Sequence, residues 1–150
     1  QSAQADGPGD QGEPSVTIFL CHASNDKKAV RNLHGDLRRA GFRPWLDEVD
    51  LLPGKEWEPE IKHVVRHSDI VLVCLSRSSI AKTGFVQKEI RYALDVADEK
   101  PEGTIYVIPV RLEERDIPNR LAKWHGVNLY ERDGFDKLNR AIKSKAKKRV

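Results

Sequence analysis

Short, almost wholly apolar runs alternate with amphipathic stretches along this chain, and this alternation is the strongest constraint on its fold. Runs suited to buried strands occupy residues 16–21, 42–46, 69–75, 104–110 and 127–130. Helical spacing of apolar residues predicts helices over 24–41, 61–65, 85–97, 117–123 and 135–142. Strands that are apolar throughout are typical of a parallel sheet buried on both faces. The order therefore predicts an α/β fold, a flavodoxin-like three-layer sandwich with a five-stranded parallel sheet and helices on both faces.

Two details of the pattern lead to more specific expectations. Pro109 lies inside the run 104–110, and because proline has no backbone N–H to donate, the strand ladder is expected to end there. The polar segment 47–57 is expected to be a loop. In folds of this class ligands bind outside the carboxyl ends of the strands. The loops to examine are those that follow Cys21, Leu46, Leu75 and Val110.

Composition and charge narrow the class of protein. With 39% hydrophobic and 33% charged residues, the 150-residue chain suits one soluble domain, and no apolar run approaches the roughly 20 residues of a membrane span. Residues 1–14 are polar and hold three acids, without an initiator Met or a signal pattern, which predicts a flexible linker or tail in a fragment of a longer chain. Residues 137–150 hold seven cations and no acid. A solvated helix end is favoured there over nucleic-acid or lipid contact, because no aromatic residue is interleaved.

Missing motifs argue against several kinds of chemistry. No GxGxxG, P-loop or GxSxG motif is present, which disfavours a bound dinucleotide cofactor, a P-loop NTPase and a nucleophile elbow. Cys21 and Cys74 each end an apolar run, and neither belongs to a CxxC pair. We expect both to be buried, reduced thiols in a cytoplasmic protein, with no metal and no cofactor. A catalytic Cys21 beside His22 is disfavoured because adjacent strand residues point to opposite faces.

Four stretches at the expected ligand-binding edge resemble a known family. They are FLCHASNDK after the first strand, WLDEVDLLPGKEW after the second, LSRSSIAKTGF after the third, and the helix that carries Glu89. In this order and spacing they resemble the TIR (Toll/interleukin-receptor) domain, bacterial-type, from residue 16 to roughly residue 145. The resemblance implies a TIR domain at 15–145 and leaves 146–150 as a basic C-terminal tail.

The family contains enzymes as well as assembly modules, and the resemblance carries both possibilities. Some members cleave NAD⁺ at the nicotinamide–ribose bond, using the Glu of an aromatic-x-x-x-Glu element. That element corresponds here to Phe85 and Glu89, with Phe in a place that commonly holds Trp. The resemblance therefore implies an NAD⁺ nucleosidase with NAD⁺ as substrate, activated by self-association with other TIR domains in a defence or signalling protein. A non-catalytic TIR–TIR interaction module is the alternative, and the loop after the second strand argues against a deoxyribosyltransferase-like enzyme.

A lone carboxylate makes chemical sense at Glu89. Its helical neighbours three and four residues away are Phe85, Val86, Tyr92 and Ala93. None of them is a cation. The nicotinamide of NAD⁺ is already cationic and leaves neutral, so one anion beside the ribose suffices and the second carboxyl group of ordinary glycosidases is not required. The expected core stripe of this helix is Val86, Ile90, Ala93, Leu94 and Ala97. Glu89 falls at its margin, and a solvated Glu paired with Lys82 or Lys55 is the competing interpretation.

Five further residues are implied as substrate contacts by the same resemblance: His22, Ser24, Asp47, Trp57 and Ser76. For most of them a structural role competes. Asp47 suits a turn, His22 suits a packed edge position, Ser24 suits a helix cap, and Trp57 suits a staple that holds the following helix to the core. Ser76, on the loop after the third strand, is expected near ribose or phosphate.

Overall fold

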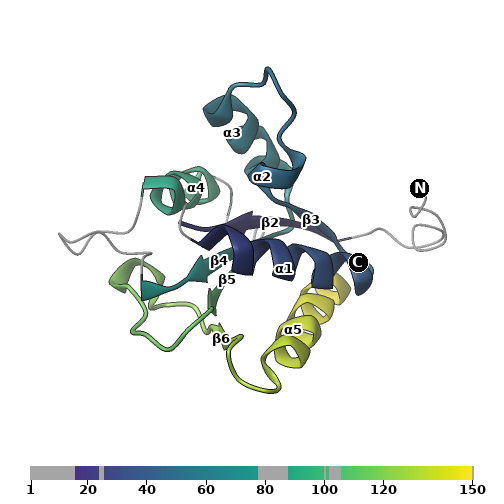
Figure 1. Cartoon of the computed structure of the whole chain (residues 1–150), viewed down its shortest axis with the longest axis vertical. Helices are drawn as coiled ribbons and strands as arrows, with labels where there is room; N and C mark the ends of the chain where they lie inside the picture. The colour runs from purple at the N-terminus through teal and green to yellow at the C-terminus, as the bar shows by residue number, and fades with distance from the viewer. Residues whose placement is uncertain (1–15, 24–25, 78–87, 100, 102–105, 150) are drawn as a thin grey trace.

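The centre of the molecule is a five-stranded parallel sheet with the strand order β3-β2-β4-β5-β6. The computed structural model describes residues 16–23, 26–77, 88–99, 101 and 106–149, excluding the side chains at 48, 88, 89 and 146–149. The strands are β2 Thr17–Cys21, β3 Arg43–Trp45, β4 Ile70–Leu75, β5 Tyr106–Arg111 and β6 Val127–Asn128. In Figure 1 α1 crosses in front of the sheet and β6 lies toward the bottom. The predicted flavodoxin-like architecture is confirmed.

Helices cover both faces of this sheet. They are α1 Lys27–Arg39, α2 Asp47–Asp50, α3 Trp57–His67, α4 Lys88–Asp98 and α5 Gly134–Arg149. The apolar residues of α1 and α5 form one core with alternate strand residues such as Leu20 and Leu72. Those of α3 and α4 form a second core with residues such as Phe19 and Val71. Each fully buried aliphatic side chain stabilises the fold by about 1.5–3 kcal/mol, so the unbroken apolar runs hold all three layers together.

The first helix shows how the sequence directs one element. Val30, Leu33 and Leu37 recur at helical spacing and are all buried, so one stripe of α1 faces the sheet. Arg38 and Arg39 lie in its last turn, where cations interact favourably with the helix dipole. The helix ends before Gly41, whose φ of 98° lies in the left-handed region that glycine adopts without steric cost. The predicted helix stop at Gly41 is confirmed.

The prediction that the ladder ends at Pro109 is wrong. β5 continues to Arg111, and Pro109 is paired with Val73 of β4. The backbone nitrogens of Tyr106 and Leu112 donate to β4-side carbonyl groups, so the alternation of a parallel ladder turns the nitrogen of Pro109 toward β6. Pairing with β6 begins only at Val110, and the missing N–H therefore costs no ladder hydrogen bond.

Two elements on the β5–β6 side are shorter than predicted. The helix expected near 117–123 is a single 3-10 turn, η4 Asn119–Leu121, and the strand expected at 127–130 is only Val127–Asn128. A β-carbon on Gly126 would lie 2.7 Å from the Pro109 carbonyl oxygen, so the chain passes very close to β5 just before β6. Tertiary packing, and not local propensity, places this segment.

The segment predicted as a loop after β3 contains a short helix, α2. The Asp50 carboxylate accepts a hydrogen bond from the Leu46 backbone N–H at 2.8 Å, while the Leu46 carbonyl accepts from the Asp50 N–H at 2.7 Å. Four residues are too few for a stable isolated helix, so the apolar periodicity used to find helices gave no signal here.

Candidate functional site

The predicted catalytic residue Glu89 lies in α4, and the rest of this helix is firmly anchored. Ile90, Ala93, Leu94 and Val96 are buried against the second core. Val96 was not part of the predicted stripe, and Ala97, which was, lies partly buried beside it. The side chain of Glu89, and all of Phe85 and Ser24, lie outside the described residues. Their assigned roles therefore remain predictions.

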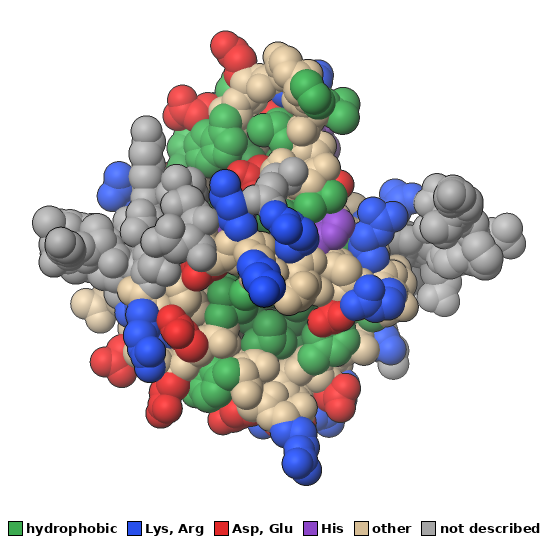
Figure 2. All heavy atoms as spheres, in the orientation of Figure 1, with side chains coloured by type: hydrophobic (Ala, Val, Ile, Leu, Met, Phe, Trp, Pro, Cys, Tyr) green, Lys and Arg blue, Asp and Glu red, His purple; other side chains and the backbone are tan. Residues whose placement is uncertain are grey.

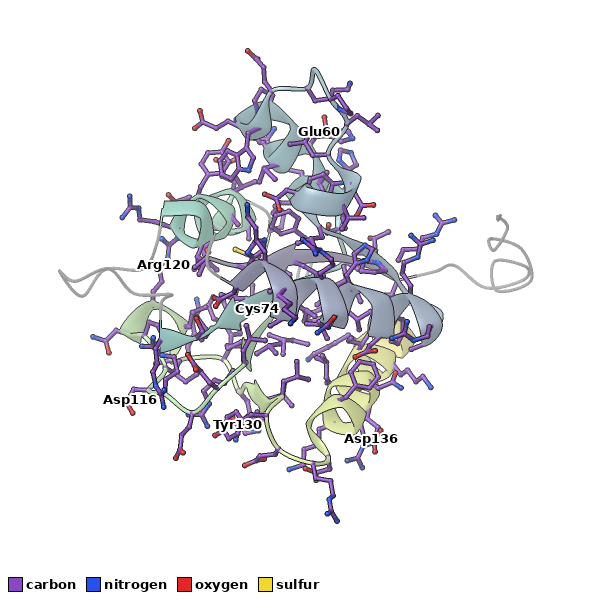
Figure 3. All side chains as sticks on the ribbon, viewed as in Figure 1. Glu60, Cys74, Asp116, Arg120, Tyr130 and Asp136 are labelled. Carbon is purple, nitrogen blue, oxygen red and sulfur yellow. The ribbon has the colours of Figure 1, made fainter. Side chains whose placement is uncertain are left out.

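Charged side chains tie the far end of α4 to two other segments. Arg120 of η4 donates to Asp95 at 2.7 Å and to Asp98 at 3.1 Å, and Figure 3 places Arg120 beside α4. Arg66 of α3 donates to Glu99 at 2.7 Å, and this hydrogen bond lowers the pKa of the exposed Glu99. Exposed ion pairs add little stability individually. Several of them converging on one helix end restrict how α4 can turn.

His22 follows β2 and is only 8% exposed. Its Nδ1 lies 2.7 Å from the Ala23 carbonyl oxygen, and its Nε2 lies 3.3 Å from Asp47 Oδ1. Both ring nitrogens face oxygen acceptors, so both must carry hydrogen, and this environment favours the imidazolium. Burial by itself would lower the pKa of His22, but the bonds to Asp47 and Ala23 and the charges of Asp47 and Asp26 together raise it above 6.5. The structure thus shows a partly buried imidazole–carboxylate pair at the carboxyl edge of the sheet.

Asp47 joins His22 to an aromatic pair. While its Oδ1 faces His22, its Oδ2 accepts a hydrogen bond of 3.4 Å from the indole N–H of Trp57. The Trp57 ring meets the Tyr92 ring with centroids 5.5 Å apart and planes tilted by 41°. Tyr92 lies three residues after Glu89, about one helical turn along α4. Three predicted site residues from separate segments are therefore connected to the helix of the predicted catalytic residue.

A surface hollow of about 740 Å³ lies beside this aromatic pair. It is lined by Glu56, Trp57, Glu58, Pro59, Lys62 and Tyr92. Its size is that of an ordinary small-molecule site. A larger hollow of about 1010 Å³ lies between β5, β6 and α5, and none of the described residues predicted for the site lines it. The candidate site is therefore identified by the side chains that line it, and not by the size of the hollow.

Ser76 takes part in an internal network. It is 4% exposed, its hydroxyl donates to Asp26 at 2.7 Å, and its carbonyl accepts from Arg115 at 2.7 Å. The predicted contact of Ser76 with ribose or phosphate remains a prediction, since its hydroxyl is bonded within the protein here. Asp26 was not among the predicted site residues. It occupies the N-cap position of α1 without making a capping bond, because its carboxylate instead holds the loops after β2 and β4 together.

The two cysteines are buried, as predicted, and neither forms a disulfide. Cys21 belongs to the second core and Cys74 to the first, so they lie on opposite faces of the sheet. Complete burial, with the nearby charge of Asp26, raises the pKa of Cys74 to about 12, which keeps this thiol protonated and unreactive. Figure 3 shows Cys74 near the centre of the molecule.

Within the described part of the chain, no group of three or more His, Cys, Asp or Glu side chains is arranged to hold a metal ion. No helix of that part is long and apolar enough to span a membrane. The described polar side chains at this edge are carboxylates, imidazole, indole and hydroxyl. Such groups can bind a polar substrate, orient it and stabilise a developing positive charge.

Known protein sequences are similar to most of this chain. Residues 18–142 match the TIR domain family. The chain is 30% identical over 110 residues to 2' cyclic ADP-D-ribose synthase AbTIR of Acinetobacter baumannii, and 31% identical over 98 residues to the uncharacterized protein y4cD of Sinorhizobium fredii. The first alignment spans 70% of this chain and 39% of the relative, and the second spans 65% and 15%. The chain therefore corresponds to well under half of either relative.

Solved structures show the same fold. The TIR domain of the Toll-related receptor TRR-2 from Hydra magnipapillata aligns with a TM-score of 0.68 at 21% identity, over 84% of this chain and 97% of that one. A prokaryotic SEFIR domain aligns at 0.65 and 18% identity, over 85% and 92%. The TIR domains of the activated Roq1 resistosome align at 0.55 and 21%, over 89% and 84%. With the sheet order and the match over residues 18–142, these likenesses lead to one conclusion: the chain belongs to the TIR domain family.

Proposed function

We propose that this domain is an NAD⁺ glycohydrolase that breaks the nicotinamide–ribose bond, with Glu89 as the catalytic residue. The observation that carries the proposal is the connection from His22 through Asp47 and Trp57 to Tyr92, one turn from Glu89 on α4. The 30% identity to a protein named 2' cyclic ADP-D-ribose synthase supports the same chemistry. The proposed setting is a defence or signalling protein of the cytoplasm.

The reaction needs little from the protein beyond charge and position. The bond between ribose C1′ and the nicotinamide nitrogen breaks, and its electron pair returns to the pyridinium ring, so that nicotinamide leaves neutral. Positive charge grows on the ribose, where the Glu89 carboxylate stabilises it. Water then attacks C1′ and loses a proton to give ADP-ribose. A hydroxyl of the same molecule doing so would give a cyclic product.

The described residues around Glu89 have distinct proposed tasks. Trp57 and Tyr92 offer half-buried ring faces beside the hollow of about 740 Å³, where a flat pyridinium ring can stack. Asp47, whose side chain is 32% exposed, can accept a further hydrogen bond from a ribose hydroxyl, because each carboxylate oxygen accepts more than one. His22 neutralises part of the Asp47 charge and holds its orientation. In this arrangement Trp57 and Tyr92 provide aromatic surface in addition to Phe85.

The test is release of nicotinamide from NAD⁺ by the purified, concentrated chain. Glu89→Gln keeps the shape of the side chain and removes its charge, and we expect cleavage to fall by about 10²–10³-fold, the usual scale for one electrostatic group. Glu99→Gln is the matched control on the other end of α4, where only the exposed pair with Arg66 is lost. Full cleavage by Glu89→Gln would remove the assignment of that residue. No cleavage by the wild type would leave the binding module as the function.

A second function, self-association, is favoured by exposed apolar side chains after β3. Val49 and Leu52 are 47% and 64% exposed, on either side of Leu51. Exposed large apolar groups mark interaction surfaces when they cluster. Leu52→Ser should lower the weight-average mass of the chain in concentration-dependent sedimentation. Tyr130→Ser, at another exposed large apolar residue (41%), is the control and should leave the mass unchanged. Equal effects of the two substitutions would contradict a role for this loop.

A further inference from the structure

Both ends of the short helix α2 are held by histidines that come from other elements. At its first residue, Asp47 Oδ1 lies 3.3 Å from His22 Nε2, in the segment after β2. At its last residue, Asp50 Oδ2 lies 3.1 Å from His34 Nε2, on α1. The histidines are 8% and 5% exposed, and the side chains of Asp47 and Asp50 are 32% and 26% exposed, so both contacts are partly shielded from water. Figure 2 shows histidine reaching the surface where α1 meets the α2 segment.

The two contacts differ in whether the histidine must be positively charged to make them. His22 makes hydrogen bonds with both ring nitrogens, to Ala23 and to Asp47, and both acceptors are oxygens. A neutral imidazole has one N–H, so it can satisfy only one of them. Among the described residues, His34 has a hydrogen-bond partner only at Nε2, which is Asp50. The neutral tautomer with hydrogen on Nε2 makes that bond without any charge.

The charges around each ring reinforce this difference. Among the described groups, the carboxylates of Asp47 and Asp26 act on His22, and both raise its pKa against the effect of burial. His34 faces Asp50 of α2, and on its own helix Arg31 and Arg38 lie three residues before it and four after. The acidic surroundings therefore favour a charged ring at His22, whereas the bond from His34 to Asp50 forms without a charge on the ring.

We propose that α2 is a pH-dependent clasp, in which His22 is the releasable anchor and His34–Asp50 is the permanent one. When His22 loses a proton, the hydrogen stays on Nδ1, whose bond to the Ala23 carbonyl is the shorter one, at 2.7 Å against 3.3 Å. Nε2 then turns from donor to acceptor and repels the Asp47 carboxylate. Asp47 then moves, and its hydrogen bond to the indole N–H of Trp57 is lost. The Asp50 end stays in place, so α2 pivots about its last residue. His22 is thus a positioning residue for Asp47 and Trp57.

The test follows the indole N–H signal of Trp57 in nitrogen–proton correlation NMR of the 150-residue chain, between about pH 5.5 and about pH 9. Trp57→Phe identifies the signal among the three tryptophans. We expect the Trp57 signal to shift with the same midpoint as the His22 ring, above pH 6.5, which is the ordinary pKa of histidine. A Trp57 signal that stays constant while His22 titrates would overturn the proposal.

Two matched variants sharpen this test. His22→Gln keeps a donor toward Asp47 that does not titrate, so the Trp57 shift should disappear. His34→Gln keeps a donor toward Asp50 and should leave the shift intact. An unchanged shift in His22→Gln, or its loss in His34→Gln, would count against the clasp. The wild-type titration needs no variant to fold, and a dispersed spectrum verifies folding of each variant.

The consequence for catalysis rests on the proposed function. If the domain cleaves NAD⁺, the loss of Asp47 positioning should lower kcat/KM as pH rises through the same midpoint. Absence of cleavage at every pH would remove the proposed function and leave the Trp57 titration as it stands. Cleavage without any change at that midpoint would show that Asp47 position is not needed for the reaction.

Discussion

The two ends of the sheet's carboxyl edge are held together by different kinds of hydrogen bond. On the β3 side the anchors are imidazole–carboxylate pairs, His22 with Asp47 and His34 with Asp50. On the β5–β6 side the anchor is Arg111, which donates to Asn128 Oδ1 at 2.7 Å and to the Arg115 carbonyl at 2.6 Å. A guanidinium stays charged at every physiological pH, and its acceptors here are neutral. One side can therefore respond to protons, while the other is permanent.

The backbone differs between the two sides in the same sense. On the β6 side, Gly126 and Gly134 approach other backbone atoms so closely that a side chain would have no room. On the β3 side, the described glycine of the loop, Gly54, has open space around its α-carbon and a φ of 89°. The candidate site therefore lies on the β3 side, where the loop glycine has open space around it. The β6 side is instead held by close contacts between backbone segments.

The largest effect should come from breaking the close contact. A β-carbon at Gly134 would lie 2.2 Å from the Asn128 carbonyl oxygen, so Gly134→Ala should lower the free energy of unfolding by about 3 kcal/mol, the upper range for overpacking. Urea unfolding measures it. Gly35→Ala is the control, because its nearest contact is the flexible end of Arg39 at 3.3 Å. It should stabilise helix α1 by about 0.5–1 kcal/mol. Equal stabilities for the two variants would refute the rigid β6 side.

A smaller effect should follow from removing the Arg111 guanidinium on the β5–β6 side. Arg111→Leu leaves the Asn128 and Arg115 oxygens without their donor, which should cost about 2 kcal/mol. Because a guanidinium does not titrate in this range, the loss should be the same at about pH 6 and about pH 8.5. Urea unfolding at both values checks it. A loss that changes with pH would mean that titratable groups also hold the β5–β6 side.

The smallest effect should be the proton-dependent one. The raised pKa of His22 means that its ion pair contributes stability fully below pH 6.5, and that this contribution is lost as pH rises through the raised value. His22→Leu should therefore cost about 1 kcal/mol at about pH 6 and less at about pH 8.5. The same unfolding series, set against Arg111→Leu, measures the difference. A cost that grows with pH would reverse the assignment of the charged ring.

Much of the fold followed from local pattern. Apolar runs long enough to be buried on both faces predicted all five strands, and the spacing of Val30, Leu33 and Leu37 predicted α1 with its stop at Gly41. These features depend on neighbours within one or two turns, which a sequence displays directly. Pro109 misled because its effect depends on which neighbouring strand its nitrogen faces. That direction is a property of the assembled sheet.

The candidate site was predicted only in part. His22, Asp47 and Trp57 were selected from their loops, and the structure brings them into contact. Tyr92 and Asp26 were missed, because their partners Trp57 and Ser76 are 35 and 50 residues away in the sequence. A signal for Tyr92 was present in its position one turn after Glu89.

The order of elements, the apolar cores and the presence of an acidic residue on the fourth helix were determined by the sequence itself, since hydrophobic burial is encoded residue by residue. Only the tertiary structure determined which of these side chains form hydrogen bonds with one another. Whether His22 must be charged depends on two oxygens, one next to it and one 25 residues away, held at fixed distance by packing. Hydrogen bonds are directional and short-ranged, so only the folded chain determines which groups form them.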